Sequence, residues 1–178
     1  YTATVDNNNI VEMLGKEIWL HSSRGAQVTI IDGEGTHRGI FNGWNETSNT
    51  IIEGFTITNC YANGGGMYNT ESSPTVKDCT FATNTAIHNG GGMHNNHSSP
   101  VLTNCTFTNN NAGAAGGGMS NDVNSSPTLT NCTFIDNLSN LQGGGMYSDY
   151  DSSPSLINCI FKNNNALLDG GGMYNVDD

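Results

Sequence analysis

The sequence repeats a block of about 26 residues four times, and this repetition limits the possible folds more than any other feature. Each copy reads roughly Ser-Ser-Pro-x-hydrophobic-x-Asn-Cys-Thr-Phe-x-x-Asn, followed some nine residues later by Gly-Gly-Gly-Met. The glycine runs end at Met67, Met93, Met119, Met146 and Met173, so the copies are 26 or 27 residues long. Because copies of nearly constant length keep neighbouring units in register, the repetition predicts a stacked solenoid.

The pattern inside one copy indicates strands. Leu129, Cys132 and Phe134 are separated by small polar residues, and no apolar stripe with helical spacing is present. The consensus of leucine-rich repeats is also missing. We therefore predict an all-β fold, a parallel β-helix with about 26–27 residues per rung. Each rung should contain three short strands, and equivalent residues of successive rungs should lie about 4.8 Å apart.

The chain is predicted to be one domain with a less regular beginning. Residues 1–54 should form about two irregular rungs, and residues 55–178 the regular repeats, without a polar cap at the C-terminus. The strands expected in the irregular part are Glu17–His21, Val28–Ile31, Gly39–Phe41 and Ile51–Ile57.

Residues that recur at the same phase of each copy are predicted to form ladders inside the coil. One apolar column contains Met67, Met93, Met119, Met146 and Met173. A second contains Phe55, Phe81, Phe107, Phe134 and Phe161, and a third Val76, Leu102, Leu129 and Leu156. A thiol column contains Cys79, Cys105, Cys132 and Cys159, two residues before the Phe column and so on the same face. An asparagine column contains Asn84, Asn110, Asn137 and Asn164. Another has Asp78 at its head and continues with Asn104, Asn131 and Asn158.

The cysteines are expected to be buried free thiols. In-register stacking leaves their Cβ atoms about 4.8 Å apart, beyond the usual 3.5 to 4.5 Å of a disulfide. Cys60 falls five residues after Phe55, where other copies have alanine or serine, and we expect it to fill the core there. No Cys/His cluster with zinc spacing is present.

Composition excludes two classes of partner. The formal net charge is −11 with five Lys and Arg residues, which argues against nucleic acids and anionic membranes. No apolar run is long enough to span a membrane.

The strongest enzyme-like cluster is Asp32, Glu34, His37 and Arg38. It lies in an Asp-Gly-Glu-Gly turn, and we interpret it as a solvated turn with a local ion pair. An active site would also break the repeat locally, and the repeats show no such break. The sequence therefore predicts no catalytic residues, although a polysaccharide lyase or hydrolase stays open.

Two outward features could bind a ligand. Tyr68, His94, Ser120, Tyr147 and Tyr174 follow the Met column, so Tyr147 and Tyr174 should stack as a small aromatic platform of the kind that sugars use. Oxygen-rich turns precede each Ser-Ser-Pro, and stacked turns of this kind can hold calcium. The candidate calcium ligands are Asp149, Asp151 and Asp178. No other cofactor is expected.

Two sets of motifs resemble known families. Val28-Thr-Ile-Ile-Asp-Gly and Ile52-Glu-Gly-Phe-Thr-Ile-Thr-Asn59 resemble the opening rungs of right-handed parallel β-helix repeat proteins. The pairing of F-x-x-N with GG-hydrophobic runs is similar to the repeats of bacterial polymorphic outer membrane proteins. This resemblance implies a right-handed coil on a secreted or cell-surface bacterial protein with a structural or adhesive, non-enzymatic role. Glycans or a host surface would be its partners. The alternative is a carbohydrate-binding or polysaccharide-degrading module.

The end of the chain suggests self-association. The segment Tyr174–Asp178 begins a rung, and Tyr1–Val5 could supply strand to a neighbouring copy. We expect axial head-to-tail stacking into fibres, or else continuation into a longer solenoid.

Overall fold

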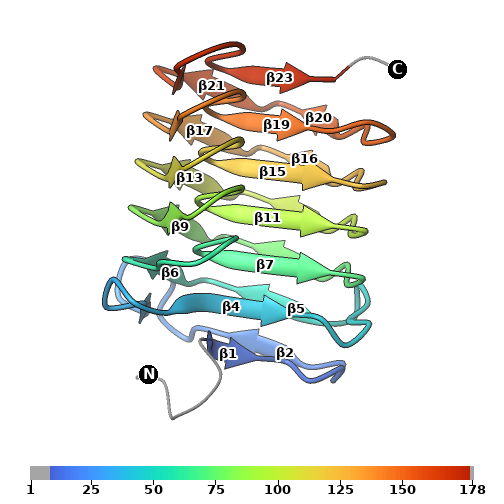
Figure 1. Ribbon diagram of the computed structural model, residues 1–178. Helices are drawn as coiled ribbons and strands as arrows, with labels where there is room; N and C mark the ends of the chain where they lie inside the picture. Colours follow the sequence, from blue (N-terminus) through green and yellow to red (C-terminus); the bar gives the residue numbers. More distant parts are fainter. Residues whose placement is uncertain (1–8, 177–178) are drawn as a thin grey trace.

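The computed structural model describes residues 9–176 and is a right-handed β-solenoid of six turns (Figure 1). No helix occurs in this part of the chain, and so none long and apolar enough to cross a membrane. The strands form parallel sheets that run along the axis of the coil, with one strand per rung in each sheet. The predicted fold class is confirmed.

Three long sheets form the walls of the coil. Sheet A contains β1 (Asn9–Glu12), β4 (Arg38–Asn42), β7 (Met67–Thr70), β11 (Met93–Asn96), β15 (Met119–Asp122), β19 (Met146–Ser148) and β23 (Met173–Asn175). Sheet B contains β2 (Trp19–His21), β5 (Ile51–Glu53), β8 (Thr75–Lys77), β12 (Val101–Thr103), β16 (Thr128–Thr130) and β20 (Ser155–Ile157). Sheet C contains β3 (Ile30–Asp32), β6 (Thr56–Thr58), β9 (Thr80–Ala82), β13 (Thr106–Thr108), β17 (Thr133–Ile135) and β21 (Ile160–Lys162).

A fourth, narrow sheet was not expected from the sequence. Sheet D contains β10 (Thr85–Ala86), β14 (Asn111–Ala112), β18 (Leu138–Ser139) and β22 (Asn165–Ala166). It lies between sheets C and A, and a single bridge from Tyr61 to Thr85 extends it toward the N-terminus. The two rungs before β7 have no strand in this sheet.

One expected strand is two strands in the structure. The range Ile51–Ile57 is divided into β5 and β6 by a turn at Gly54, whose φ of 79° is left-handed. The same turn recurs between sheets B and C in every later rung, and its left-handed residues there are Asp78, Asn104, Asn131 and Asn158. Short polar side chains tolerate this conformation better than bulky ones, which explains the Asp/Asn column. The side-chain amide of Asn104 donates a hydrogen bond to the carboxylate of Asp78, one rung before it. Asn131 and Asn158 each donate in the same way to the side-chain oxygen of the asparagine one rung before.

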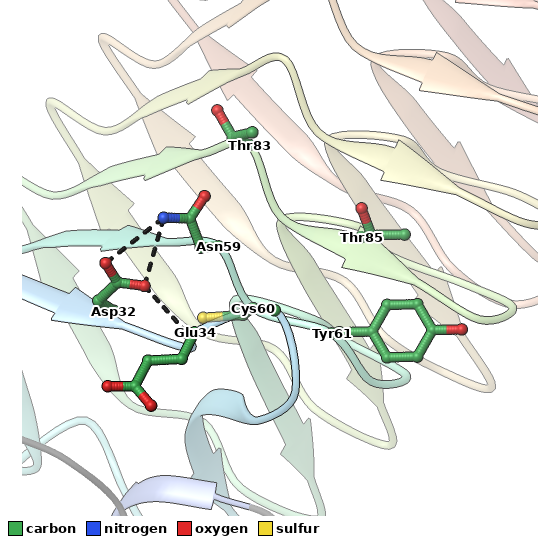
Figure 2. A pocket seen from close by; sticks show the side chains of 8 residues that line it. Asp32, Glu34, Asn59, Cys60, Tyr61, Thr83 and Thr85 are labelled. Atoms are coloured by element: carbon green, nitrogen blue, oxygen red, sulfur yellow. Dashed lines mark hydrogen bonds between the residues drawn. The ribbon is translucent and has the colours of Figure 1, made fainter.

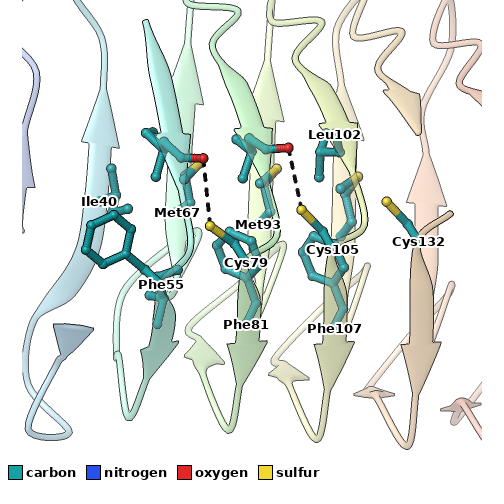
Figure 3. Close-up of a cluster of buried hydrophobic side chains, with 14 of the residues drawn as sticks. Ile40, Phe55, Met67, Cys79, Phe81, Met93, Leu102, Cys105, Phe107 and Cys132 are labelled. Carbon is teal, nitrogen blue, oxygen red and sulfur yellow. Dashed lines mark hydrogen bonds between the residues drawn. The ribbon is translucent and has the colours of Figure 1, made fainter. Parts of the chain in front are cut away.

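The core is a set of in-register columns between the sheets. The rings of Phe81, Phe107, Phe134 and Phe161 stack at centroid distances of 4.7 to 4.8 Å. The Met column and the Val/Leu column pair in the same way, and Ile40 and Ile52 continue them into the rung before Met67. Figure 3 shows these side chains pointing into the coil from successive rungs. Leu156, Phe161 and Met173 are only partly buried because they belong to the last described rung.

The predicted position of Phe55 is wrong. Ile57 is the residue that pairs with Phe81, so Ile57 precedes Phe81 in this column, and Ile31 precedes Ile57. Phe55 lies level with Cys79, since the Thr80 amide bonds to the Phe55 carbonyl just as the Thr106 amide bonds to the Cys79 carbonyl. The reason is that the first copy has two residues fewer between Ile57 and Met67 than the next has between Phe81 and Met93. Counting back by a constant period therefore shifts the register by two.

The predicted position of Cys60 is wrong for the same reason, the two-residue shift in register. Its backbone amide donates to Asn84 Oδ1 at 3.1 Å, so Cys60 heads the inner asparagine ladder and does not fill the alanine position. Ala62 takes that position and is buried. Cys60 is nevertheless buried and free, as are Cys79, Cys105 and Cys132, whereas Cys159 is half-buried.

A second inner ladder escaped the sequence analysis. Asn42, Asn69, Asn95 and Asn121 are fully buried in sheet A, and each side-chain amide donates to the next residue in the series, ending at Ser148. Asn69, Asn95 and Asn121 each lie two residues after a methionine of the Met column, and Asn42 lies two residues after Ile40. This constant spacing was a signal for the ladder in the sequence. Hydrogen bonding between rungs thus satisfies polar groups that the narrow coil has to bury.

Candidate functional site

The best-formed candidate site is an open groove of about 350 Å³ at the first turns between sheets C and A. It is lined by Asp32, Glu34, Gly35, Asn59, Cys60, Tyr61, Thr83 and Thr85. Figure 2 shows Asp32 and Asn59 on one side and Tyr61 on the other. Sheet D begins at this level, where Thr85 of β10 lines the groove and forms a single bridge with Tyr61.

Three stacked turns build the groove. The turn that follows β3 lies directly against residues 59–61, since Gly33 N donates to Thr58 O at 2.8 Å and Tyr61 N to His37 O at 2.9 Å. A Cβ atom at Gly33 would lie 2.5 Å from the Cys60 Cα atom, so glycine is required for this approach. Residues 83–85 of the next rung form the far wall.

The polar side chains of the groove are held in place. Asp32 Oδ1 accepts the Glu34 amide at 2.9 Å, and the Asn59 side chain donates to both Asp32 oxygens at 3.3 and 3.4 Å. Glu34 is exposed and has a left-handed φ of 52°. Tyr61 is 46% exposed. The groove therefore offers two carboxylates, an amide, an aromatic ring and two threonine hydroxyls to solvent.

The floor of the groove is chemically unreactive. Burial raises the pKa of the Cys60 thiol to about 12, and the charge of Asp32 adds to the shift. The thiol donates to the Thr58 carbonyl at 3.2 Å. A thiol in this state is not a nucleophile at neutral pH.

The structure separates the four residues of the enzyme-like cluster. Asp32 and Glu34 line the groove, but Arg38 lies on the outer face of sheet A. There its guanidinium donates to Asn9 Oδ1 and to the Asn63 carbonyl, and lies 5.1 Å from the Tyr68 ring centroid. His37 Nδ1 pairs with the Thr36 hydroxyl. The local ion pair expected among these residues is thus not formed.

The outward column of sheet A is more covered than predicted. Tyr68 stacks on His94 at a centroid distance of 5.0 Å, but His94 and Ser120 are buried. The glycine-rich turns fold over them: a Cβ atom at Gly64 would lie 3.0 Å from the His94 Cβ atom. Close packing of this kind accounts for glycine at the start of the Gly-Gly-Gly-Met runs.

Asp122 joins the covered part of this column. Its carboxylate pairs with His94 Nε2 at 2.8 Å, and accepts the Ser120 hydroxyl at 2.6 Å and the Asn89 amide at 3.0 Å. Burial alone would raise the pKa of Asp122, but these partners, His94 first, lower it below its ordinary value. Ser120, His94 and Asp122 are not a catalytic triad, because both Ser120 and His94 bond to the aspartate and the serine is inaccessible.

Tyr147 and Tyr174 stack as predicted, with nearly parallel rings whose centroids lie 6.0 Å apart. The Tyr147 hydroxyl lies 3.5 Å from Asp149 Oδ1. Burial and the charge of Asp149 raise the pKa of Tyr147 to about 12. Sugar binding by this pair stays a prediction.

The predicted calcium ligands are not assembled within the described part of the chain. Residues 9–176 contain no group of three or more His, Cys, Asp or Glu side chains placed to hold a metal ion. Asp149 and Asp151 lie in the turn after β19, and Asp178 lies outside the described residues. The calcium site stays a prediction.

A family model for the right-handed beta helix region matches residues 1–178. The chain belongs to this family. No curated protein and no solved structure matches the chain. The right-handed beta helix family includes both enzymes and proteins without catalytic activity, so membership gives the fold and leaves the activity of this β-helix open.

Proposed function

We propose that this β-helix is a non-enzymatic, extracellular or cell-surface scaffold that binds carbohydrate in the groove beside Asp32 and Tyr61. The observation that carries the proposal is the position of the groove. It lies where the otherwise regular repeat is broken, and it gathers hydrogen-bonding side chains around an exposed aromatic ring. Sugar sites typically combine such polar groups with an aromatic face.

The regular rungs support the scaffold part of the proposal. Their side chains are engaged in stacking and in hydrogen bonds between rungs, as in the Asn and Phe ladders. A rod of this kind presents a fixed surface at a distance from its attachment point. Adhesive and structural surface proteins need this property.

The charge of the groove favours a particular class of sugar. Asp32 and Glu34 contribute two carboxylates, and none of the described lining residues is basic. Acidic polysaccharides would be repelled, whereas a protonated amine on a sugar would be attracted. We therefore propose oligomers of glucosamine, or other amine-bearing glycans, as ligands.

Calorimetric titration with glucosamine oligomers tests this proposal, with galacturonate oligomers as the acidic comparison. Tyr61→Ala and Asp32→Asn should each weaken binding roughly tenfold, about 1.4 kcal/mol. Tyr150→Ala and Asp136→Asn are matched controls, because both side chains are exposed and lie outside the groove. Equal affinity for both sugars, or equal loss in the control variants, would refute the proposal.

The two carboxylates also make polysaccharide hydrolysis the second candidate function. Release of new reducing ends from a chitosan or pectin chain by the wild type, lost in both Asp32→Asn and Glu34→Gln, would establish it. We expect no release, because the Asp32 carboxylate is already held by Asn59 and by the Glu34 amide.

A further inference from the structure

A residue with a strained backbone stands in the far wall of the groove. Thr83 lines the groove and has a left-handed φ of 58°. This conformation is a rare one for a β-branched residue, because its Cβ atom lies too close to the following carbonyl oxygen. Strained residues persist only where the surrounding structure fixes them, and they cluster at functional sites. The presence of threonine here therefore needs an explanation.

Other rungs form the same turn with less strain. The residue directly after β6, β9, β13, β17 and β21 is left-handed in every case, with φ between 51° and 58°. Apart from Thr83, these residues are Asn59, Asn109, Asp136 and Asn163. Short polar side chains tolerate the left-handed conformation. An asparagine side chain would thus suit the turn after β9 better than the threonine that is found there.

Stacking between rungs holds the Thr83 backbone in this conformation. The Thr83 amide donates to the Thr108 carbonyl at 3.0 Å, just as the Asn109 amide donates to the Ile135 carbonyl at 3.1 Å. The turn therefore keeps the register of its neighbours and does not relax to suit the side chain.

The Thr83 side chain leaves hydrogen-bonding groups of the groove open. Thr83 is exposed, and its hydroxyl bonds to no other group of residues 9–176. An asparagine in its place would lie one rung after Asn59 and would reach the Asn59 side-chain oxygen, as Asn131 reaches Asn104 in the turn between sheets B and C. Figure 2 shows this Asn59 oxygen pointing away from Asp32. With threonine in the turn, both the Asn59 oxygen and the Thr83 hydroxyl stay accessible to a ligand.

We propose that Thr83 determines the specificity of the groove for the hydroxyl groups of a sugar, an inference that rests on the proposed carbohydrate binding. The Thr83 hydroxyl donates to or accepts from one sugar hydroxyl, and the Asn59 oxygen accepts from another. The carboxylates of Asp32 and Glu34 attract the sugar amine on the other side of the groove. The chain keeps this open wall at the cost of a strained turn, a trade between stability and function that is common at binding sites.

Melting temperatures followed by circular dichroism test the strain without any ligand. Thr83→Asn should raise the melting temperature by about 2 to 4 °C, the shift that relief of one strained residue gives in a domain of this size. Thr83→Val keeps the branched side chain and should shift it by less than about 2 °C. An unchanged or lowered melting temperature in Thr83→Asn would overturn the proposal.

Calorimetric titration with glucosamine oligomers tests the hydroxyl. Thr83→Val removes the hydroxyl and should weaken binding roughly three- to tenfold, the effect of one lost hydrogen bond. Thr83→Asn should also weaken binding, because its amide occupies the Asn59 oxygen, whereas Thr83→Ser keeps the hydroxyl and should keep the affinity. Wild-type affinity in Thr83→Val would overturn the role of Thr83 and leave the proposed function standing. Absence of binding by the wild-type chain would refute both.

Val123→Asn is the matched control. Val123 is another β-branched residue with a left-handed φ, here 49°, and it lies after β15 and outside the groove. Val123→Asn should raise the melting temperature as Thr83→Asn does, but it should leave the affinity for glucosamine oligomers unchanged. Equal losses of affinity in the two variants would show a general effect of relieving strain and would overturn the assignment of specificity to Thr83.

Discussion

Asn137 accepts two hydrogen bonds from Asn110 through one side-chain oxygen. The backbone amide and the side-chain amide of Asn110 both lie 3.0 Å from Asn137 Oδ1. The Asn137 amide in turn donates to the Phe107 carbonyl at 3.0 Å. One side chain thus satisfies three buried polar groups across the turn between sheets C and D.

Asn137→Ala should therefore destabilise the coil more than its loss of volume suggests. Each buried group left without a partner costs about 1 to 3 kcal/mol. Urea unfolding would measure the change in free energy of unfolding. Asn131→Gly is the matched control, because it removes an exposed ladder residue and keeps a residue that tolerates φ of 55°. Comparable losses in both variants would contradict the assignment of the ladders.

Phe134→Ala should cost about 3 to 5 kcal/mol, because the ring is fully buried between Phe107 and Phe161. Thr130→Ala on the outer side of sheet B should change the free energy of unfolding by less than about 0.5 kcal/mol. Thermal unfolding followed by circular dichroism compares the two. A silent Phe134 variant would mean that the column is not packed.

Asp122→Asn should weaken the coil at neutral pH by roughly 1.5 to 3 kcal/mol, the range for hydrogen bonds to charged groups. The pKa of Asp122 is lowered in the fold, so the carboxylate stabilises above its unfolded pKa of about 4. This contribution is lost as the pH falls through the folded pKa. The difference in stability between wild type and variant should accordingly shrink below pH 4. A difference that does not vary with pH would count against a charged Asp122.

Tyr147 should ionise near pH 12, because burial and the charge of Asp149 raise its pKa above the ordinary tyrosine value. The absorbance difference at alkaline pH between wild type and Tyr147→Phe isolates its titration. Because the unfolded chain loses this proton near pH 10, the stabilising contribution declines between about pH 10 and 12. Asp149→Asn should lower the midpoint, since the charge of Asp149 contributes to the raised pKa. A wild-type midpoint near 10 would disprove the contact.

Much of the fold could be predicted because the spacing of the copies shows which residues of successive rungs lie opposite each other. Met93 pairs with Met119, and Leu102 with Leu129, as equal spacing predicts. The inner ladder from Asn69 to Asn121 also recurs at a fixed spacing, two residues after each Met, but asparagine alone does not indicate whether its side chain is buried or exposed. Phe55 was misplaced for a different reason. A constant period cannot reveal that one connection is two residues shorter.

The candidate site could be predicted only in part. Asp32 and Glu34 stand out as acidic residues in a turn, but nothing in their spacing brings Tyr61 or Thr85 to them. Those contacts arise because successive rungs stack, so residues 26 or so positions apart become neighbours. Arg38 is close to Asp32 in the chain, yet the strand that follows the turn carries it to another face.

The sequence by itself determined the architecture, because side chains that recur at one phase can all be buried only if the copies stack in register. Tertiary structure alone decided where the regular surface is interrupted. The groove has walls from three rungs, and the turn at Gly33 can lie against Cys60 only because position 33 carries no side chain. Which residues of successive rungs pair depends on the path that each connecting turn takes in space. The repeat pattern along the chain does not contain that path.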